Sequence, residues 1–217
     1  MSEVETADGI RPDRPPLRSA AARSISKRVL DVTTAAMILA LVAPLFVLVT
    51  VAIKLDSRGP ALFRQRRTGL GGEAFSILKF RSMRVLEDDG DLKQATRSDS
   101  RITRVGAVIR ALSIDELPQL INVLKGEMSL VGPRPHALSH DELWARTAPG
   151  YAQRFRVRPG LTGCAQVNGL RGEIRELAQI RARVDADNWY IDNWSLRLDL
   201  VILLRTVPLL FHDPRAY

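Results

Sequence analysis

The feature that most constrains this chain is an uncharged apolar run of about 22 residues, Val32 to Ile53. A helix of that length rises roughly 33 Å, which is enough to cross the hydrocarbon core of a bilayer. Soluble helices rarely stay apolar on every face. The run therefore predicts a membrane helix and leaves a buried core helix as the alternative.

Pro44 lies near the middle of this run, where it removes a backbone hydrogen bond and bends the helix. Cations flank both ends of the run: Arg23, Lys27, Arg28, Lys54, Arg58, Arg64, Arg66 and Arg67. The positive-inside rule therefore gives no orientation for a simple span. A re-entrant helix that breaks at Pro44 and returns to the same face keeps both flanks in the cytoplasm, and this is the topology that we expect.

The 217 residues suit a single folded domain. Residues 1–26 are rich in prolines and charges and poor in large apolar side chains, which predicts a disordered tail. Residues 27–58 form the expected membrane segment, and residues 59–217 the expected cytoplasmic domain. Cys164 is the only cysteine, which excludes an internal disulfide framework.

The chain is basic, with 32 lysines and arginines against 24 acidic residues and a formal net charge of +8. This balance favours an anionic partner, which is nucleic acid, an acidic lipid headgroup or a phosphorylated substrate. A nucleic-acid reader needs aromatic side chains beside its cations, whereas the tryptophans lie apart from the arginine clusters. A membrane-tethered nucleic-acid-binding protein without enzymatic activity is therefore only the alternative, and we expect no nucleic-acid partner.

Two further segments have a recognisable pattern. Glycines at 69, 71 and 72 separate two short strand-like runs and predict a small β-hairpin. Lys79 and Arg81 follow it, as either a solvated cationic face or a phosphate clamp. Residues 188–211 begin with aromatic residues and mix apolar residues with cations, which predicts a helix in the membrane interface, with a core helix as the alternative.

The stretch SIDELPQLIN, residues 113–122, places two carboxylates, Asp115 and Glu116, beside a helix start. Ser113 and Glu116 have the spacing of a capping box, and Pro118 is typical of a first helical turn. Free N–H groups at a helix start favour carboxylates and bind phosphate. With Arg110 and Arg134 nearby, the pair is either a plain cap or a phosphoryl-transfer site.

Two smaller clusters leave alternatives open. His136 and His140, with Asp141 and Glu142 beside them, have the spacing of a metal-binding helix, which makes zinc a minor alternative. The segment RVRPGLTGCAQVNGLRG, residues 156–172, combines turn residues, arginines and amides, as a loop that binds a nucleotide or a sugar does.

Several long motifs occur in an order that resembles the bacterial sugar transferases, the monotopic polyprenyl-phosphate phosphoglycosyl transferases. They are the proline-broken apolar helix, KFRSM at residues 79–83, the block from RITRVGAVIR to VGPRP, RPGLTGCAQVNG and the final amphipathic stretch. The motifs PRPHALSH, NGLRGE, NWSLRLDL and RAY are most similar to the undecaprenyl-phosphate glucose phosphotransferases of exopolysaccharide synthesis. The resemblance covers the chain from about Lys27 to Tyr217.

The resemblance implies transfer of hexose 1-phosphate, most simply glucose 1-phosphate, from a UDP-sugar to undecaprenyl phosphate, with release of UMP. In such enzymes the aspartate of an Asp-Glu pair attacks the donor phosphate and holds the sugar phosphate covalently. Asp115 is then the nucleophile, and Mg²⁺ binds at Glu116 and Asp115. The implied phosphate-binding residues are Arg110, Arg134, Lys79 and Arg81, and Gln166 and Asn168 belong to a substrate loop.

The implied fold is α+β and mainly helical, in a monotopic membrane protein with a re-entrant helix broken at Pro44, a small β-hairpin and interfacial amphipathic helices. The implied location is the cytoplasmic membrane of a bacterium, with the catalytic domain, residues 59–217, on the cytoplasmic face. Membrane lipids are then partners, and a homodimer is compatible with the resemblance. Two residues depart from the family: Ala43 replaces a frequent serine before Pro44, and Cys164 stands where close relatives usually have tryptophan.

Overall fold

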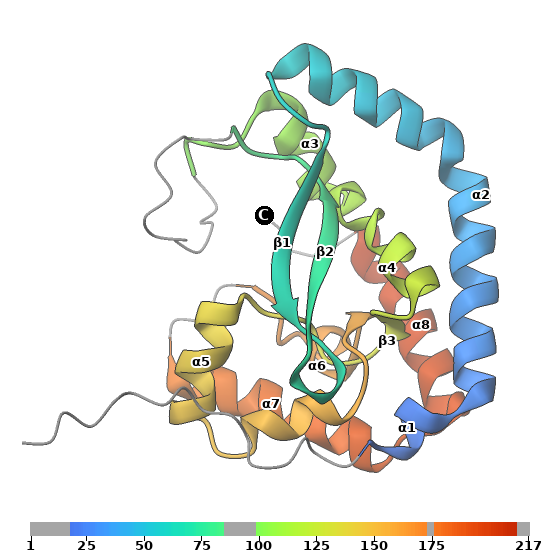
Figure 1. Ribbon diagram of the computed structural model, residues 1–217, viewed down its shortest axis with the longest axis vertical. Coiled ribbons are helices and arrows are strands. Elements are labelled where there is room, and N and C mark those ends of the chain that lie inside the picture. The colour runs from blue at the N-terminus through green and yellow to red at the C-terminus, as the bar shows by residue number, and fades with distance from the viewer. Residues whose placement is uncertain (1–17, 85–98, 173–175, 212–217) are drawn as a thin grey trace, which may run out of the picture.

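A computed structural model describes residues 18–84, 99–172 and 176–211 (Figure 1). The chain forms helices (α), 3-10 turns (η) and strands (β) in this order: α1 Ala20–Arg23, α2 Ile25–Asp56, β1 Leu62–Thr68, η1 Leu70–Gly72, β2 Ala74–Phe80, α3 Arg104–Ala111, η2 Ile114–Glu116, α4 Gln119–Lys125, β3 Ser129–Val131, α5 Leu138–Thr147, η3 Tyr151–Arg156, β4 Gly160–Thr162, α6 Cys164–Val167, α7 Leu177–Asp192 and α8 Leu196–Phe211.

The predicted mainly helical α+β fold is confirmed by this order of elements. The helical part starts earlier than predicted, because α1 and the first residues of α2 fall within the segment that we expected to be a disordered tail. Ser24 explains the start of α2, since its side chain accepts a hydrogen bond from the backbone N–H of Lys27. Residues 1–17 of the predicted tail lie outside the described residues.

Helix α2 is a single 32-residue helix with Pro44 inside it. Figure 1 shows that it bends part-way along and curves around one side of the molecule. Proline removes one backbone hydrogen bond and crowds the preceding turn, which accounts for a bend. The chain therefore bends, without the helix break that the sequence predicted at this position.

The N-terminal end of α2 is fixed to the body of the molecule by buried polar contacts. The Asp31 carboxylate accepts hydrogen bonds from the Ser129 hydroxyl at 2.7 Å and from the Leu130 N–H at 2.9 Å. Lys27 donates from Nζ to the Asp199 carboxylate at 2.8 Å. These contacts join α2 to β3 and α8, across about a hundred residues of sequence or more.

The C-terminal end of α2 is fixed to the same body. Asp56 accepts a hydrogen bond from the backbone N–H of Val105, at the start of α3, at 3.0 Å. The Arg81 guanidinium, which follows β2, donates to the carbonyl of Ser57 at 2.7 Å. Both ends of the apolar helix are therefore attached to one folded unit.

Between these ends, α2 exposes a broad apolar surface. Its exposed large side chains are Ile25, Val29, Met37, Leu41, Val47, Leu48, Val51 and Leu55. Within the described residues, α2 is the one helix long and apolar enough to cross a membrane. Only 11% of its most apolar window is buried, so the alternative of a buried core helix is wrong. Such a surface fits membrane association.

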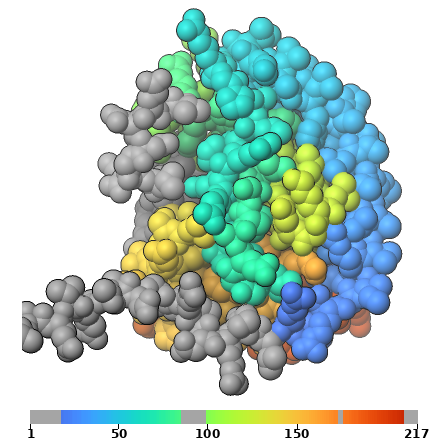
Figure 2. Space-filling model, in the orientation of Figure 1, coloured from blue at the N-terminus to red at the C-terminus, as the bar shows by residue number. Residues whose placement is uncertain are grey.

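Strands β1 and β2 form the predicted antiparallel hairpin, in which Phe63 pairs with Lys79 and Arg67 pairs with Phe75. Gly71 and Gly72 in the turn have φ angles of 69° and 83°, which glycine adopts without strain. Figure 2 shows the hairpin across the middle of one face, with α2 along its side. A second pair, β3 with β4, is parallel and was not predicted.

The segment 188–211, which we predicted to be one helix, belongs to two. Helix α7 ends at Asp192, and α8 begins at Leu196. Helix α8 is amphipathic, with Ile202 buried and with Leu200, Leu204 and Val207 exposed among its large apolar residues. An exposed apolar face beside cations is typical of a helix that lies in a membrane interface. A plain core helix would bury these apolar side chains. The exposure of Leu200, Leu204 and Val207 therefore favours a helix that lies in the membrane interface.

Candidate active site

The two carboxylates of SIDELPQLIN lie in the short turn η2, before α4 begins. Ser113 has a left-handed backbone with φ 54° and makes no capping hydrogen bond through its side chain. The predicted capping box is therefore wrong. Pro118 immediately precedes α4, so its predicted place at a helix start is confirmed.

Glu116 binds two cations from distant parts of the chain. Lys79 at the end of β2 donates to Oε1 at 2.9 Å. Arg134, in the loop after β3, donates from Nη1 to Oε2 at 3.1 Å and from Nη2 to Oε1. This two-pronged contact is the strong form of an arginine–carboxylate pair. Burial raises the pKa of Glu116, but Arg134 and Lys79 outweigh it and hold that pKa well below its usual 4.5.

Asp115 is the opposite case, although it is the next residue in the chain. Its side chain is buried, at 8% exposure, and within the described residues its carboxylate accepts no hydrogen bond. Burial raises the pKa of Asp115 from 3.8 to about 6, against the attraction of Lys79 and with the repulsion of Glu116. Asp115 is therefore mostly ionised at neutral pH and has no partner to displace before it reacts.

The structure brings most of the predicted phosphate-binding residues to this pair. Lys79 and Arg134 contact Glu116 directly, and Arg110 at the end of α3 lowers the pKa of Asp115 by its charge. Arg81 is different, because its guanidinium is buried against the end of α2, with hydrogen bonds to the carbonyls of Pro60 and Ser57. Arg81 thus closes a helix end and does not reach the carboxylates.

The tentative substrate loop is also placed apart from the carboxylates. Gln166 is buried, and its amide donates to the carbonyl of Leu161 at 3.1 Å. Asn168 donates to the Cys164 sulfur at 3.4 Å. Neither side chain makes a contact with Asp115 or Glu116 within the described residues. Their role in binding a nucleotide or sugar stays a prediction.

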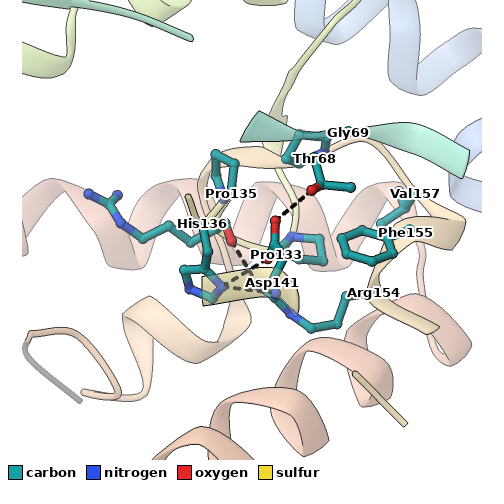
Figure 3. A pocket seen from close by; sticks show the side chains of 11 residues that line it. Thr68, Gly69, Pro133, Pro135, His136, Asp141, Arg154, Phe155 and Val157 are labelled. Carbon is teal, nitrogen blue, oxygen red and sulfur yellow. Dashed lines mark hydrogen bonds and ion pairs between the residues drawn. The ribbon is translucent and has the colours of Figure 1, made fainter. Parts of the chain in front are cut away.

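His136 belongs to a buried network of a different kind (Figure 3), and the partly buried His140 packs on Trp144 beside it. His136 Nδ1 lies 2.7 Å from the Tyr151 hydroxyl and 3.1 Å from Arg154 Nη1, and Trp144 packs against both histidine rings. Burial and the charge of Arg154 hold the pKa of His136 well below 6.5. In the described part of the chain, no three metal-binding side chains are grouped to hold an ion. The structure therefore gives no support to zinc.

This network supports the loop that carries Arg134. Arg154 donates to the Arg134 carbonyl at 2.7 Å and, through Nε, to the Asp187 carboxylate at 2.8 Å. Thr68 donates to Asp141, as a dashed line between these labelled side chains in Figure 3 shows. The Tyr151 hydroxyl donates to the other oxygen of the same carboxylate. Side chains of β1, α5, η3 and α7 thereby hold one loop in place.

Sequence reasoning missed Arg154, Asp187 and Tyr151. A buried arginine in RFRVRPG looks like any of the other arginines in a basic segment. The spacing of 33 residues between Arg154 and Asp187 carries no local signal. Only the spacing of His136 and His140, with Asp141 and Glu142 beside them, indicated this part of the site, and that pattern pointed to a metal.

Comparison with known proteins decides the family. The family model described as "Bacterial sugar transferase" matches residues 22–213. The chain belongs to the bacterial sugar transferase family. Its members are transferases, and the described turn, hairpin and arginine loop all lie inside the matched range.

Among curated relatives in this family, one from Caulobacter vibrioides is named UDP-glucose:undecaprenyl-phosphate glucose-1-phosphate transferase. It is 56% identical over 208 residues, which are 96% of this chain and 77% of that protein. Proteins of the same name from Klebsiella pneumoniae and Escherichia coli are 46% and 47% identical over 89% and 88% of this chain. The chain spans only 42% and 41% of the length of those two proteins.

Proposed function

We propose that this protein transfers glucose 1-phosphate from UDP-glucose to undecaprenyl phosphate and releases UMP. The observation that carries the proposal is the contrast within one turn, where Glu116 is bound by Lys79 and Arg134, whereas Asp115 accepts no hydrogen bond from any described residue. The names of the relatives supply the substrates. Two relatives with other names, exopolysaccharide production proteins from Rhizobium species, support a role in exopolysaccharide production, and we place this reaction at its initiating step.

The proposed first step uses the Asp115 carboxylate as the nucleophile. One of its oxygens attacks the donor phosphorus that carries the sugar, and the bond from that phosphorus to the oxygen bridging to UMP breaks. The electron pair of the broken bond stays on UMP, and the sugar phosphate is held as an acyl phosphate on Asp115. In the second step a phosphate oxygen of the lipid attacks the same phosphorus and releases Asp115.

The charge of the site suits a diphosphate. Lys79 and Arg134 bind Glu116, and the charges of Lys79, Arg110 and Arg134 all act on Asp115, so three cations lie around the two carboxylates. Phosphoryl transfer depends mainly on positioning and on stabilising the charge of the phosphate oxygens. We assign Arg134 and Arg110 to the donor phosphates, and Lys79 to the correct placement of Glu116.

Mg²⁺ is part of the proposal. The cation commonly binds one or two carboxylates and completes its shell with substrate phosphates and water. Asp115 and Glu116 would supply the carboxylates, with Glu116 exchanging a contact with Lys79 or Arg134 for the ion, and the donor would bring the phosphate oxygens. When bound, the ion would neutralise charge on the diphosphate and on leaving UMP.

The two attached ends of α2 support a re-entrant topology. We propose that the bent helix enters the bilayer and returns, so that the body lies on the cytoplasmic face of a bacterial inner membrane. The exposed apolar face of α8 would lie in the same interface. A lipid substrate keeps its phosphate at headgroup level, where a site held against the membrane can reach it. A homodimer is compatible with this arrangement.

The test is UMP release by the purified protein with UDP-glucose, undecaprenyl phosphate and Mg²⁺. Asp115→Asn should abolish both UMP release and labelling of the protein by sugar phosphate. Chelation of Mg²⁺ should stop turnover, and added Mg²⁺ should restore it. Release of UDP would identify a glycosyl transfer and overturn the covalent mechanism.

A panel of UDP-hexoses in the same assay tests the choice of sugar. The nucleic-acid alternative is tested by a salt-sensitive shift of labelled nucleic acid without UMP release. Two tryptophans give that alternative no support, because Trp144 packs on His136 and Trp194 donates to buried Asp199. Their rings are engaged inside the protein and do not offer stacking faces for bases.

A further inference from the structure

Arg67, at the end of β1, is a cation that contacts no acidic side chain among the described residues. It lies largely inside the protein, and within the described residues it forms no ion pair. Its Nε is buried and makes no hydrogen bond there. Burial and the nearby charge of Arg134 lower the pKa of Arg67 to about 10, and they outweigh the attraction of Asp141 and Glu116, neither of which contacts it. A buried charge is costly unless it is paired, so this guanidinium is arranged for an anion that comes from outside the chain.

The guanidinium is held in a defined orientation. Arg67 Nη2 donates to the side-chain oxygen of Gln65, which lies two residues before it on β1. Nη1 lies 3.5 Å from the Pro135 carbonyl, at the outer limit of a hydrogen bond. The next residue, Thr68, donates to Asp141 at 2.6 Å and fixes the end of the strand (Figure 3). Arg67 is thus placed by its neighbours without being neutralised by them.

Arg67 and Lys79 belong to the same face of the hairpin. Side chains alternate along a strand, so Phe63, Gln65 and Arg67 point to one side, together with their partners Lys79, Ile77 and Phe75. Lys79 binds Glu116, and Arg134 lies near both Glu116 and Arg67. The cations therefore continue from the carboxylates past Arg134 to Arg67.

We propose that Arg67, oriented by Gln65, binds the nucleotide α-phosphate of the donor and neutralises the charge that UMP acquires as it leaves. The inference rests on the proposed function. When Asp115 attacks the phosphorus that carries the sugar, the bridging bond breaks and its electron pair goes to the α-phosphate of UMP. The Arg67 guanidinium lies beyond Arg134, where the second phosphate of UDP-glucose would lie. Its two parallel N–H groups suit the oxygens of a phosphate.

A purely structural role predicts something different. If Arg67 only supported the Pro135 loop, its loss would lower stability and turnover together, without a specific effect on UMP. A phosphate-binding role predicts weaker binding of UMP itself, which is a product and needs no chemistry. Charge-assisted hydrogen bonds contribute roughly 1.5–3 kcal/mol, which corresponds to about a 10- to 100-fold change in affinity.

The experiment measures UMP binding and the exchange of labelled UMP into UDP-glucose, which needs no lipid acceptor, in Arg67→Met and in the parent. We expect the UMP dissociation constant to rise at least tenfold in Arg67→Met, the exchange to fall, and guanidinium ion to restore part of it. Arg66→Met is the matched control, because Arg66 is an exposed neighbour on the other face of the strand and should bind UMP as the parent does.

A UMP affinity within twofold of the parent in folded Arg67→Met would overturn the inference. If that variant does not fold, Gln65→Leu keeps the charge and removes its orienting contact. We expect about a threefold to tenfold weaker UMP binding in it, and an unchanged value would overturn the inference equally. Failure of the parent to exchange UMP at all would instead count against the proposed function.

Discussion

Lys79 and Glu116 form an ion pair of 2.9 Å that ties the end of the β-hairpin to the turn before α4. Arg134 binds the same carboxylate from a third segment. Glu116 therefore forms the ion pairs with both nearby cations, whereas the buried Asp115 carboxylate accepts no hydrogen bond from the described residues and can attack a substrate. Two neighbouring acids thus have different ionisation behaviour because of their different tertiary contacts.

Removal of the charge of Asp115 should stabilise the protein while it removes activity. Because the folded pKa is raised from 3.8 to about 6, the ionised form is disfavoured by folding. Asp115→Asn, at pH 7.5, should raise the free energy of unfolding by roughly 1–3 kcal/mol. Thermal unfolding of both proteins in the same detergent measures this difference.

The size of this stabilisation should depend on pH. For a group with a raised folded pKa, the stabilising contribution is present below the unfolded pKa and is lost as pH rises through the folded value. The melting temperatures of parent and Asp115→Asn should therefore converge below about pH 4 and separate above about pH 6. A difference that is constant from pH 4 to 8 would contradict the raised pKa.

The pH dependence of turnover should also follow the ionisation of Asp115. An attacking carboxylate must be ionised, so kcat/KM for the donor should fall as pH drops below about 6, tenfold per unit once well below it. Labelled-UMP exchange across pH 4.5–8 measures this without the second substrate. An activity that stays constant down to pH 4.5 would mean that Asp115 has an ordinary pKa or is not the nucleophile.

Arg154 should act on activity through the Arg134 loop. Arg154→Leu removes the donor to the Arg134 carbonyl and leaves Asp187 as an unpaired buried acid, at a cost of roughly 3–5 kcal/mol. In the double variant Arg154→Leu/Asp187→Leu, stability should return in part, because the unpaired charge is gone. The donor KM should be raised in Arg154→Leu and should stay raised in the double variant, because the Arg134 loop lacks the Arg154 hydrogen bond in both. Recovery of both together would show that Arg154 matters only for stability.

Substitutions of Arg81 and Lys79 should have different effects, although the two residues lie only two positions apart in KFRSM. Arg81→Leu removes the donor to two carbonyls at the end of α2 and should lower the melting temperature, with little change in the donor KM of the folded enzyme. Lys79→Met loses the hydrogen bond to Glu116 and the attraction of Asp115, and it should raise the donor KM with little change in the melting temperature. Equal effects on KM would return Arg81 to the phosphate-binding residues.

Tags should reveal the topology of α2. If the helix returns to the face from which it enters, a tag before Lys27 and a tag after Arg58 should both be protected from protease added outside intact cells. Both should be cut after the cells are opened. Access to only one of the tags from outside would establish a full span.

The sequence predicted those features that depend on local composition. The long apolar run, the glycine turn of the hairpin and the placement of Pro118 each follow from neighbouring residues alone. The capping box failed because Glu116 finds stronger partners in Lys79 and Arg134, which are far from it in sequence. In the sequence, Arg81 cannot be distinguished from a phosphate-binding arginine. Its contacts depend on where the end of α2 lies in the folded protein, which the neighbouring residues do not indicate.

Asp31 and Asp56, which fix the two ends of α2, lie about seven helical turns apart and so point in nearly the same direction around the helix axis. Insertion of one residue between them would rotate one anchor by about 100° relative to the other, and one of the two attachments would be lost. The length of this helix can therefore change only in steps close to whole turns. A seven-residue insertion preserves the phase, and it is the change by which insertion depth could be varied while both anchors remain.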